Sequence, residues 1–221
     1  WGLSRLTIER DAPAAPSTSF VAQLVAGFRH LLSRSDLRLL LALTALNGLL
    51  GRTIIELLPA LSGQVLQGGS AELAVLVAMA GLGSVLGGLL LSRQAADLAR
   101  LMVLVCAAIA LAGLALIGLQ WFAGLVGLAL WVSILSIVTT VAGTGSQTLI
   151  QLTASAEYRG RVMSVWTMLA MGAPALGAAL LGAGVDGFGF SRVAVWTGGA
   201  GIVLVISLYA RRSRVLAGGN P

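Results

Sequence analysis

Six long apolar runs determine what this chain can fold into. They are predicted at residues 36–58, 71–91, 101–119, 121–150, 162–183 and 191–210. A run of about 20 apolar residues crosses a bilayer as a helix, because in lipid each backbone amide must be paired within its own segment. The 221-residue chain is 57% hydrophobic and only 10% charged, whereas soluble domains carry about 25% charged residues. The sequence therefore predicts an all-α membrane protein with six transmembrane helices.

The segments outside the runs predict the remaining organisation. Residues 1–19 mix charges with Pro, Ala, Ser and Thr and are typical of a flexible cytoplasmic linker. Residues 20–34 place apolar side chains at helical spacing, which indicates an amphipathic helix at the membrane surface. Residues 35–212 form the transmembrane domain, with Pro59 expected to end the first helix, and residues 213–221 form a cytoplasmic tail. The fourth run, at about 1.5 Å per residue, is long enough for its polar end, "TTVAGTGSQT", to project beyond the hydrocarbon.

The positive charges predict the orientation. All 14 basic residues are Arg. Nearly all lie before or near the start of the first run, or after the second, fourth and sixth runs, which places them on one side of the membrane. By the positive-inside rule both ends of this chain are cytoplasmic, in a multi-pass protein of the cell (inner) membrane. The net charge of +6 does not indicate nucleic-acid binding, because the arginines are spread over helix ends rather than gathered in one basic surface. The expected surroundings are the lipid bilayer.

Three stretches resemble a known family. They are "NGLLGRTIIELLPAL", "GGSAELAVLVAMAGLGSVLGGLL" and "QLTASAEYRGRVMSVWTMLAMGAPALGAALLGAGVD". Over residues 20–212 the chain resembles the C-terminal six-helix half of major facilitator superfamily transporters of the enterobactin-exporter-like group, most specifically at "RGRVMS". The resemblance implies a permease fold in which two six-helix halves enclose the substrate. Because the chain begins at Trp1, we expect an N-terminal half to be missing from it.

A charged pair inside the first run is the main candidate for function. Asn47, Arg52 and Glu56 fall on one half of the predicted helix, and the aliphatic half opposite is expected to face lipid. Counting from Asp36 at about 1.5 Å per residue places Arg52 about 24 Å deep, near the far edge of the membrane. The pair is therefore either part of a substrate cavity or outer gate, or a structural ion pair at the membrane rim. Gln147 on the fourth helix either lines the same path or bonds to neighbouring backbone.

Charged residues at the cytoplasmic ends form a second candidate. The resemblance implies that such charges make and break salt bridges as the two halves move, whereas each Arg alone is explained by helix anchoring. Asp97 is expected to make a specific pair, because acidic residues contribute little to topology. The cytoplasmic gate candidates are Arg93, Asp97, Arg100, Glu157, Arg159 and Arg161.

Small residues predict close helix packing and bending rather than chemistry. In lipid, glycines at helical spacing let backbones approach each other. The candidates for packing and bending are Gly83, Gly87, Gly172, Pro174 and Gly177.

The remaining motifs exclude several classes of activity. The only histidine, His30, lies in the surface helix, away from any serine of an intramembrane protease, and Cys106 lies in an apolar run. We expect that the chain is not an enzyme and that it binds neither a metal nor a cofactor. By the resemblance we expect a secondary active permease, a proton-coupled antiporter for efflux of small molecules such as drugs or siderophores, working by alternating access. The alternative is a self-contained six-span protein that acts as a homodimer or as a non-transporting scaffold.

Overall fold

The computed structural model describes residues 33–66, 68–93, 97–121 and 124–217. The predicted linker at 1–19 and nearly all of the surface helix at 20–34 lie outside these residues. The described part is helical apart from short turns, without a strand. Its elements are α2 (Ser35–Asn47), the π-helical segment η2 (Gly48–Arg52), α3 (Thr53–Glu56), α4 (Leu58–Val65), α5 (Ser70–Ser92), α6 (Leu98–Gly118), the 3₁₀ turn η3 (Leu119–Trp121), α7 (Gly124–Thr153), α8 (Arg159–Phe188) and α9 (Phe190–Ala217).

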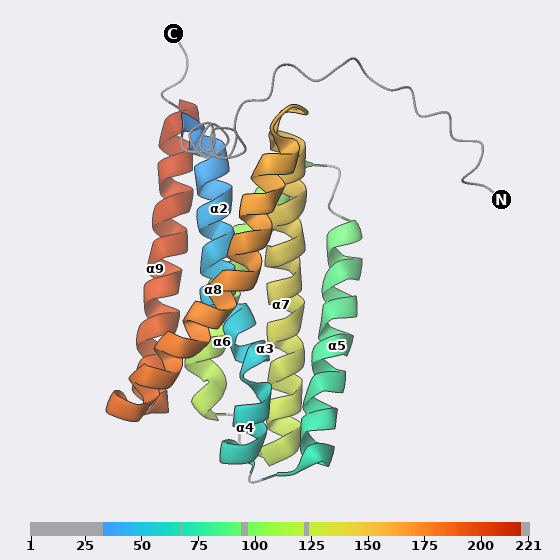
Figure 1. The fold of residues 1–221 in the computed structure, drawn as a ribbon, viewed down its shortest axis with the longest axis vertical. Helices are drawn as coiled ribbons and strands as arrows, with labels where there is room; N and C mark the ends of the chain where they lie inside the picture. Colours follow the sequence, from blue (N-terminus) through green and yellow to red (C-terminus); the bar gives the residue numbers. More distant parts are fainter. Residues whose placement is uncertain (1–32, 67, 94–96, 122–123, 218–221) are drawn as a thin grey trace, which may run out of the picture.

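Six helices of the described part are long and apolar enough to cross a membrane. The first is built from α2, η2 and α3 together, and α5 to α9 supply the other five. All six begin within three residues of the predicted positions. The helices run alternately up and down, so the start of α2 and the end of α9 lie at the same end of the bundle (Figure 1). The helix α9 continues to Ala217, beyond its predicted end at residue 210.

The first and fourth spans form the centre of the bundle. Trp131 on α7 is fully buried and donates a hydrogen bond from Nε1 to the carbonyl oxygen of Ala115, 2.8 Å away on α6. The aliphatic half of α2 and η2, which we expected to face lipid, is instead buried against neighbouring helices, as shown by Leu43, Leu46 and Leu50. The expectation was wrong because α2 packs against α6, α7, α8 and α9, so that its apolar side meets protein. The polar side of the first span is the side that remains partly exposed.

Pro59 does not end the first helix as predicted. The helix α3 ends at Glu56, Leu57 turns the chain, and α4 begins with Pro59 in its first turn. Proline suits this position because the first N–H groups of a helix have no intrahelical acceptor and its fixed φ is already helical. Pro59 therefore begins a short helix at the lower end of the bundle (Figure 1) rather than a loop.

Close packing through small residues is found at most of the predicted glycines. A Cβ at Gly83 would collide with the backbone of Ser133 on α7, one at Gly87 would lie 2.7 Å from the carbonyl oxygen of Ile137, and Gly177 on α8 packs directly on Thr53. Gly172 makes no such close contact within the described part, since outside its own stretch of helix nothing lies within 4 Å of a Cβ placed there. A bending role for Gly172 stays a prediction. Bending at Pro174, which is buried inside α8, stays a prediction.

Other close approaches were not predicted, and the clearest joins α6 to α9. Gly113 of α6 and Gly198 of α9 face each other, and a Cβ on either would lie within 2.9 Å of the other's carbonyl oxygen. This contact holds α9 against α6.

Candidate functional site

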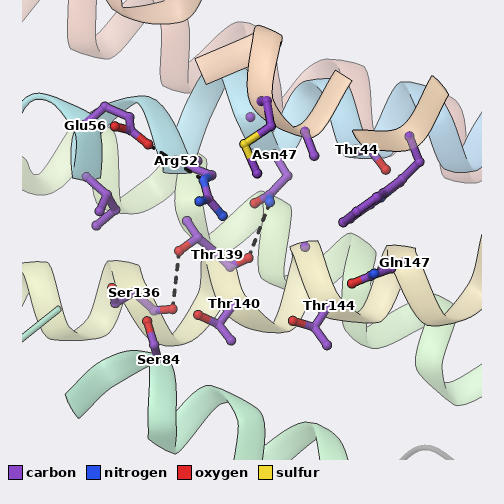
Figure 2. A pocket seen from close by; sticks show the side chains of 16 residues that line it. Thr44, Asn47, Arg52, Glu56, Ser84, Ser136, Thr139, Thr140, Thr144 and Gln147 are labelled. Carbon is purple, nitrogen blue, oxygen red and sulfur yellow. Dashed lines mark hydrogen bonds and ion pairs between the residues drawn. The ribbon is translucent and has the colours of Figure 1, made fainter. Parts of the chain in front are cut away.

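A polar cavity of about 340 Å³ lies in the bundle between the first span, α5, α7 and α8. This volume falls within the range of about 300–1,000 Å³ typical of small-molecule sites. Figure 2 shows Asn47 and Arg52 extending toward α7 from one side, and Ser84 extending toward α7 from α5. The polar side chains that line the cavity are Thr44, Asn47, Arg52, Glu56, Ser84, Ser136, Thr139, Thr140, Thr144 and Gln147. All four residues proposed from the sequence as substrate or gate candidates are therefore in one cavity.

The π-helical segment explains how Asn47 and Arg52 reach the same cavity. In an α-helix two residues five positions apart point about 140° away from each other, because each residue turns the chain by about 100°. In η2 the N–H of Thr53 donates to the carbonyl oxygen of Gly48, five residues back, which is the spacing of a π-helix. The wider turn brings residues five apart nearly into line, so that the amide of Asn47 and the guanidinium of Arg52 lie on one wall.

The segment η2 is tightly held by its neighbours. Thr53 is fully buried, and its hydroxyl donates to the carbonyl oxygens of Gly48 at 2.8 Å and of Pro174 at 3.3 Å. A Cβ at Gly48 would lie 2.7 Å from the Cβ of Ala173. The irregular backbone is thus placed where α8 lies against it, which is where such irregularities occur inside membranes.

The Arg52–Glu56 ion pair predicted from the sequence is present but loose. Arg52 Nε lies 3.9 Å from Glu56 Oε1, and the two side chains are 52% and 56% exposed. Arg52 lies level with the middle of α7, since neighbouring Gly51 packs on Thr139, the sixteenth of the 30 residues of that helix. Glu56, one turn further on, is the last residue of α3. Counting residues from Asp36 had placed Arg52 closer to the membrane rim. An open ion pair with Arg52 at this height is consistent with a cavity wall.

Asn47 is buried, and half of its amide has no partner. Only 5% of the residue is exposed, its Nδ2 donates to the carbonyl oxygen of Thr139 at 3.3 Å, and its Oδ1 has no partner among the described residues. Trp166 of α8 lines the same cavity, and its buried Nε1 likewise has no acceptor in the described chain. Buried polar atoms are normally hydrogen-bonded, so two unpaired ones on residues that line the same cavity are unusual.

One face of α7 supplies most of the hydroxyl groups. Ser136, Thr140, Thr144 and Gln147 recur at spacings of three and four, which align them on one side of a helix. Ser146, on another face, bonds to Gly143 and to Thr44, which is the packing role considered for these residues from the sequence. The stretch 139–148, which we expected to project beyond the hydrocarbon, supplies part of the cavity lining. Its position relative to the hydrocarbon stays a prediction.

Pro174 gives the cavity a further acceptor. Proline has no N–H, so the carbonyl of Ala170, four residues earlier, lacks its usual helical donor. Ala170 lines the cavity beside Met171. The sequence did not point to the Ala170 carbonyl, nor to Ser84, Ser136 and Trp166 as cavity residues. Small and aromatic residues within an apolar run are typical of helix packing.

The cytoplasmic gate candidates do not form one cluster in this structure. Asp97 begins α6, where its Oδ1 accepts hydrogen bonds from the N–H groups of Ala99 and Arg100 at 2.9 and 3.2 Å. Its Oδ2 also pairs with Arg100 Nε at 3.2 Å, so the predicted specific pair of Asp97 is present. Arg161 lies over the ring of Tyr158, 5.4 Å from its centre. Among the described residues no ion pair joins the 93–100 group to the 157–161 group.

Comparisons with protein-family models, with curated proteins and with solved structures find no significant match to this chain.

Proposed function

We propose that this chain is one six-helix half of a secondary active transporter, a proton-coupled exporter of small molecules such as drugs or siderophores. In this proposal the cavity is half of the substrate site, and a second six-helix half closes it and alternates its access between the two membrane faces. The chemistry is binding and release, and no bond of the substrate is broken.

The observation that carries this proposal is the open ion pair in the cavity wall. A charged side chain at the centre of a membrane helix costs about 2.5–3.5 kcal/mol on insertion scales, so such residues face water or protein. Arg52 and Glu56 are each about half exposed in the bundle, and lipid is a poor cover for them. A second protein half with a water-filled space between the two satisfies both charges.

The apolar surroundings support the same assignment. Large apolar side chains are exposed along α5, α8 and α9, as with Leu89, Met168 and Val203, which suits lipid or another membrane helix. The polar residues are concentrated in the cavity, as in transporter sites near the bilayer midplane.

A transport assay tests the proposal. The complete gene is expressed in a bacterial strain that lacks its own efflux pumps, and accumulation of a panel of drugs and siderophores is measured with and without a proton uncoupler. We expect uncoupler-sensitive efflux of at least one compound, and loss of that efflux in Arg52→Leu with membrane insertion unchanged. Arg192→Leu, which removes an exposed arginine from α9 away from the cavity, is the matched control.

The alternative of a self-contained protein makes a different prediction. If a second copy of this chain covers the cavity, native mass spectrometry of the chain in nanodiscs gives a dimer that Arg52→Glu weakens. Dimerisation without efflux of any compound would contradict the transporter proposal.

A further inference from the structure

The side chains that line the cavity indicate which kind of molecule it can bind. We infer that the cavity selects an uncharged small molecule that carries several hydroxyl groups next to an apolar ring. This inference rests on the proposed function only in treating the cavity as a binding site, and it adds the class of ligand.

Hydrogen-bonding groups of both kinds lack partners inside the protein. The Oδ1 of Asn47 is a free acceptor on a residue that is only 5% exposed, and the Nε1 of Trp166 is a free donor. The carbonyl of Ala170 is a second acceptor that Pro174 leaves without its helical donor. A hydroxyl group can both donate and accept, so one kind of ligand group suits all three. The Oδ1 and Nε1 atoms are themselves buried, so a ligand reaches them only when the side chains around them shift.

The other polar side chains that line the cavity are also uncharged, and they include both hydrogen-bond donors and acceptors. Thr140, Thr144 and Gln147 line the cavity from α7, and their side chains make no hydrogen bond to another described residue. Ser84 adds a hydroxyl from α5. Hydroxyls and amides offer donors and acceptors at several points, which matches a ligand with several hydroxyls better than one with a single polar group.

The charges of the cavity argue against an ion as ligand. Among the described lining residues only Arg52 and Glu56 are charged, and they are paired with each other. A cation or an anion would have to compete with this loose pair for its counter-charge, a cost that a neutral ligand does not meet. A neutral ligand leaves the existing pair undisturbed.

Apolar groups complete the description. Ile55, Met171 and the indole of Trp166 line the cavity beside the polar residues. They offer a surface for a ring or another flat apolar part, in the way that most ligand sites combine apolar walls with a few polar contacts.

The test compares ligands that share a phenyl ring and differ in the polar group. Phenyl β-D-glucoside is neutral and hydroxylated, phenyltrimethylammonium is a cation, phenylacetate is an anion and phenylalanine is a zwitterion. Binding to the chain in nanodiscs is measured by saturation-transfer NMR titration, with empty nanodiscs subtracted. We expect the glucoside to bind at least about tenfold more tightly than any of the other three.

Matched variants connect the binding to the cavity. Thr144→Val and Asn47→Leu each remove a polar group, and each should weaken glucoside binding by about tenfold, because a ligand hydroxyl then loses its partner. Thr148→Val, one turn along α7, removes a hydroxyl that bonds to the carbonyl of Thr144 and does not line the cavity, and it should have no effect. Trp166→Phe should weaken binding whereas Trp196→Phe on α9 should not.

The outcomes separate this inference from the transporter proposal. Equal or tighter binding of the cation, anion or zwitterion overturns the inference, as does glucoside binding that Thr144→Val leaves unchanged in a folded protein. Either result can accompany Arg52-dependent efflux, in which case the transporter proposal stands alone. Selective glucoside binding without any efflux would support the ligand class and contradict transport.

Discussion

Asn47 connects the first and fourth spans through a single hydrogen bond, from its Nδ2 to the carbonyl oxygen of Thr139, 92 residues away in the chain. The bond fixes the orientation of the amide. Its Oδ1 is buried and has no partner among the described residues, and the residue also lines the cavity, so one side chain both joins two helices and contributes to the candidate site.

Replacing Asn47 by Leu should affect binding more than stability. The carbonyl of Thr139 lies within α7 and keeps its own helical donor, so loss of the side-chain bond should lower the free energy of unfolding by only about 1 kcal/mol. Unfolding in mixed micelles measures the change. A loss far above 3 kcal/mol would show that Asn47 is mainly structural.

Exchanging the charges of Arg52 and Glu56 should separate a cavity role from that of a structural ion pair. Because the side chains are half exposed and four residues apart, removing the pair should change stability by only about 0.5 kcal/mol. We expect the double variant Arg52→Glu with Glu56→Arg to insert and fold normally but to remain inactive in efflux. Recovered efflux in the double variant, with loss in each single variant, would show that only the pairing matters.

Replacing Gly83 or Gly81 on α5 by alanine should change the stability of the bundle in opposite directions. A Cβ at Gly83 would meet the Ser133 backbone and lie 2.8 Å from the Cβ of Ser136, so Gly83→Ala should destabilise the bundle by about 1–3 kcal/mol. No atom lies within 4 Å of that position at Gly81, where Gly→Ala should stabilise the helix by up to about 1 kcal/mol. Thermal unfolding of both variants checks the signs. Equal effects would contradict close α5–α7 packing at Gly83.

Gly48 and Ala173 should be energetically coupled. A Cβ at Gly48 would lie 2.7 Å from that of Ala173, so Gly48→Ala should destabilise the contact between η2 and α8. Ala173→Gly makes room and should recover part of the loss. A double-mutant cycle on unfolding free energies should give a coupling of at least about 0.5 kcal/mol, and strict additivity would mean that the two residues do not meet.

The orientation is testable with two new cysteines in a Cys106→Ala background. Trp121, exposed in η3, and Ser155, exposed between α7 and α8, lie at opposite ends of the bundle. Because Ser155 is close to Arg159 and Arg161, we expect it on the cytoplasmic side. A membrane-impermeant maleimide added to intact cells should label Trp121→Cys and spare Ser155→Cys, and the reverse pattern would invert the topology.

The six long helices could be predicted because span length and apolar content are local properties of the sequence. The cavity residues Asn47, Arg52, Glu56 and Gln147 could be found as well, since polar side chains inside apolar runs are costly without a reason. The direction that Leu43 and Leu50 face could not be predicted, because it depends on whether the helix is central or peripheral, and helical periodicity is the same in both cases.

Other features escaped prediction because they depend on pairs of residues far apart in the chain. Gly113 meets Gly198 and Gly177 meets Thr53, whereas Gly172, in a similar sequence context, meets no residue of another described helix. The π-helical turn at Gly48–Arg52 has no distinct composition, and it is supported by contacts with α8. Trp166 resembles an ordinary apolar residue in the sequence, and only the fold shows that its indole N–H lacks an acceptor within the described chain.

Because of the π-helical turn, the part of the first span after Arg52 has an alternative rotation about the helix axis and an alternative position along it. If the same residues adopted α-helical hydrogen bonding, the segment after Arg52 would rotate by about 100° and advance by about 1.5 Å. Thr53 would then move away from the carbonyl of Pro174, and Glu56 would turn away from the wall it now forms. A shift of one hydrogen-bond register, without any movement of whole helices, would thus be enough to remove a charge from the cavity.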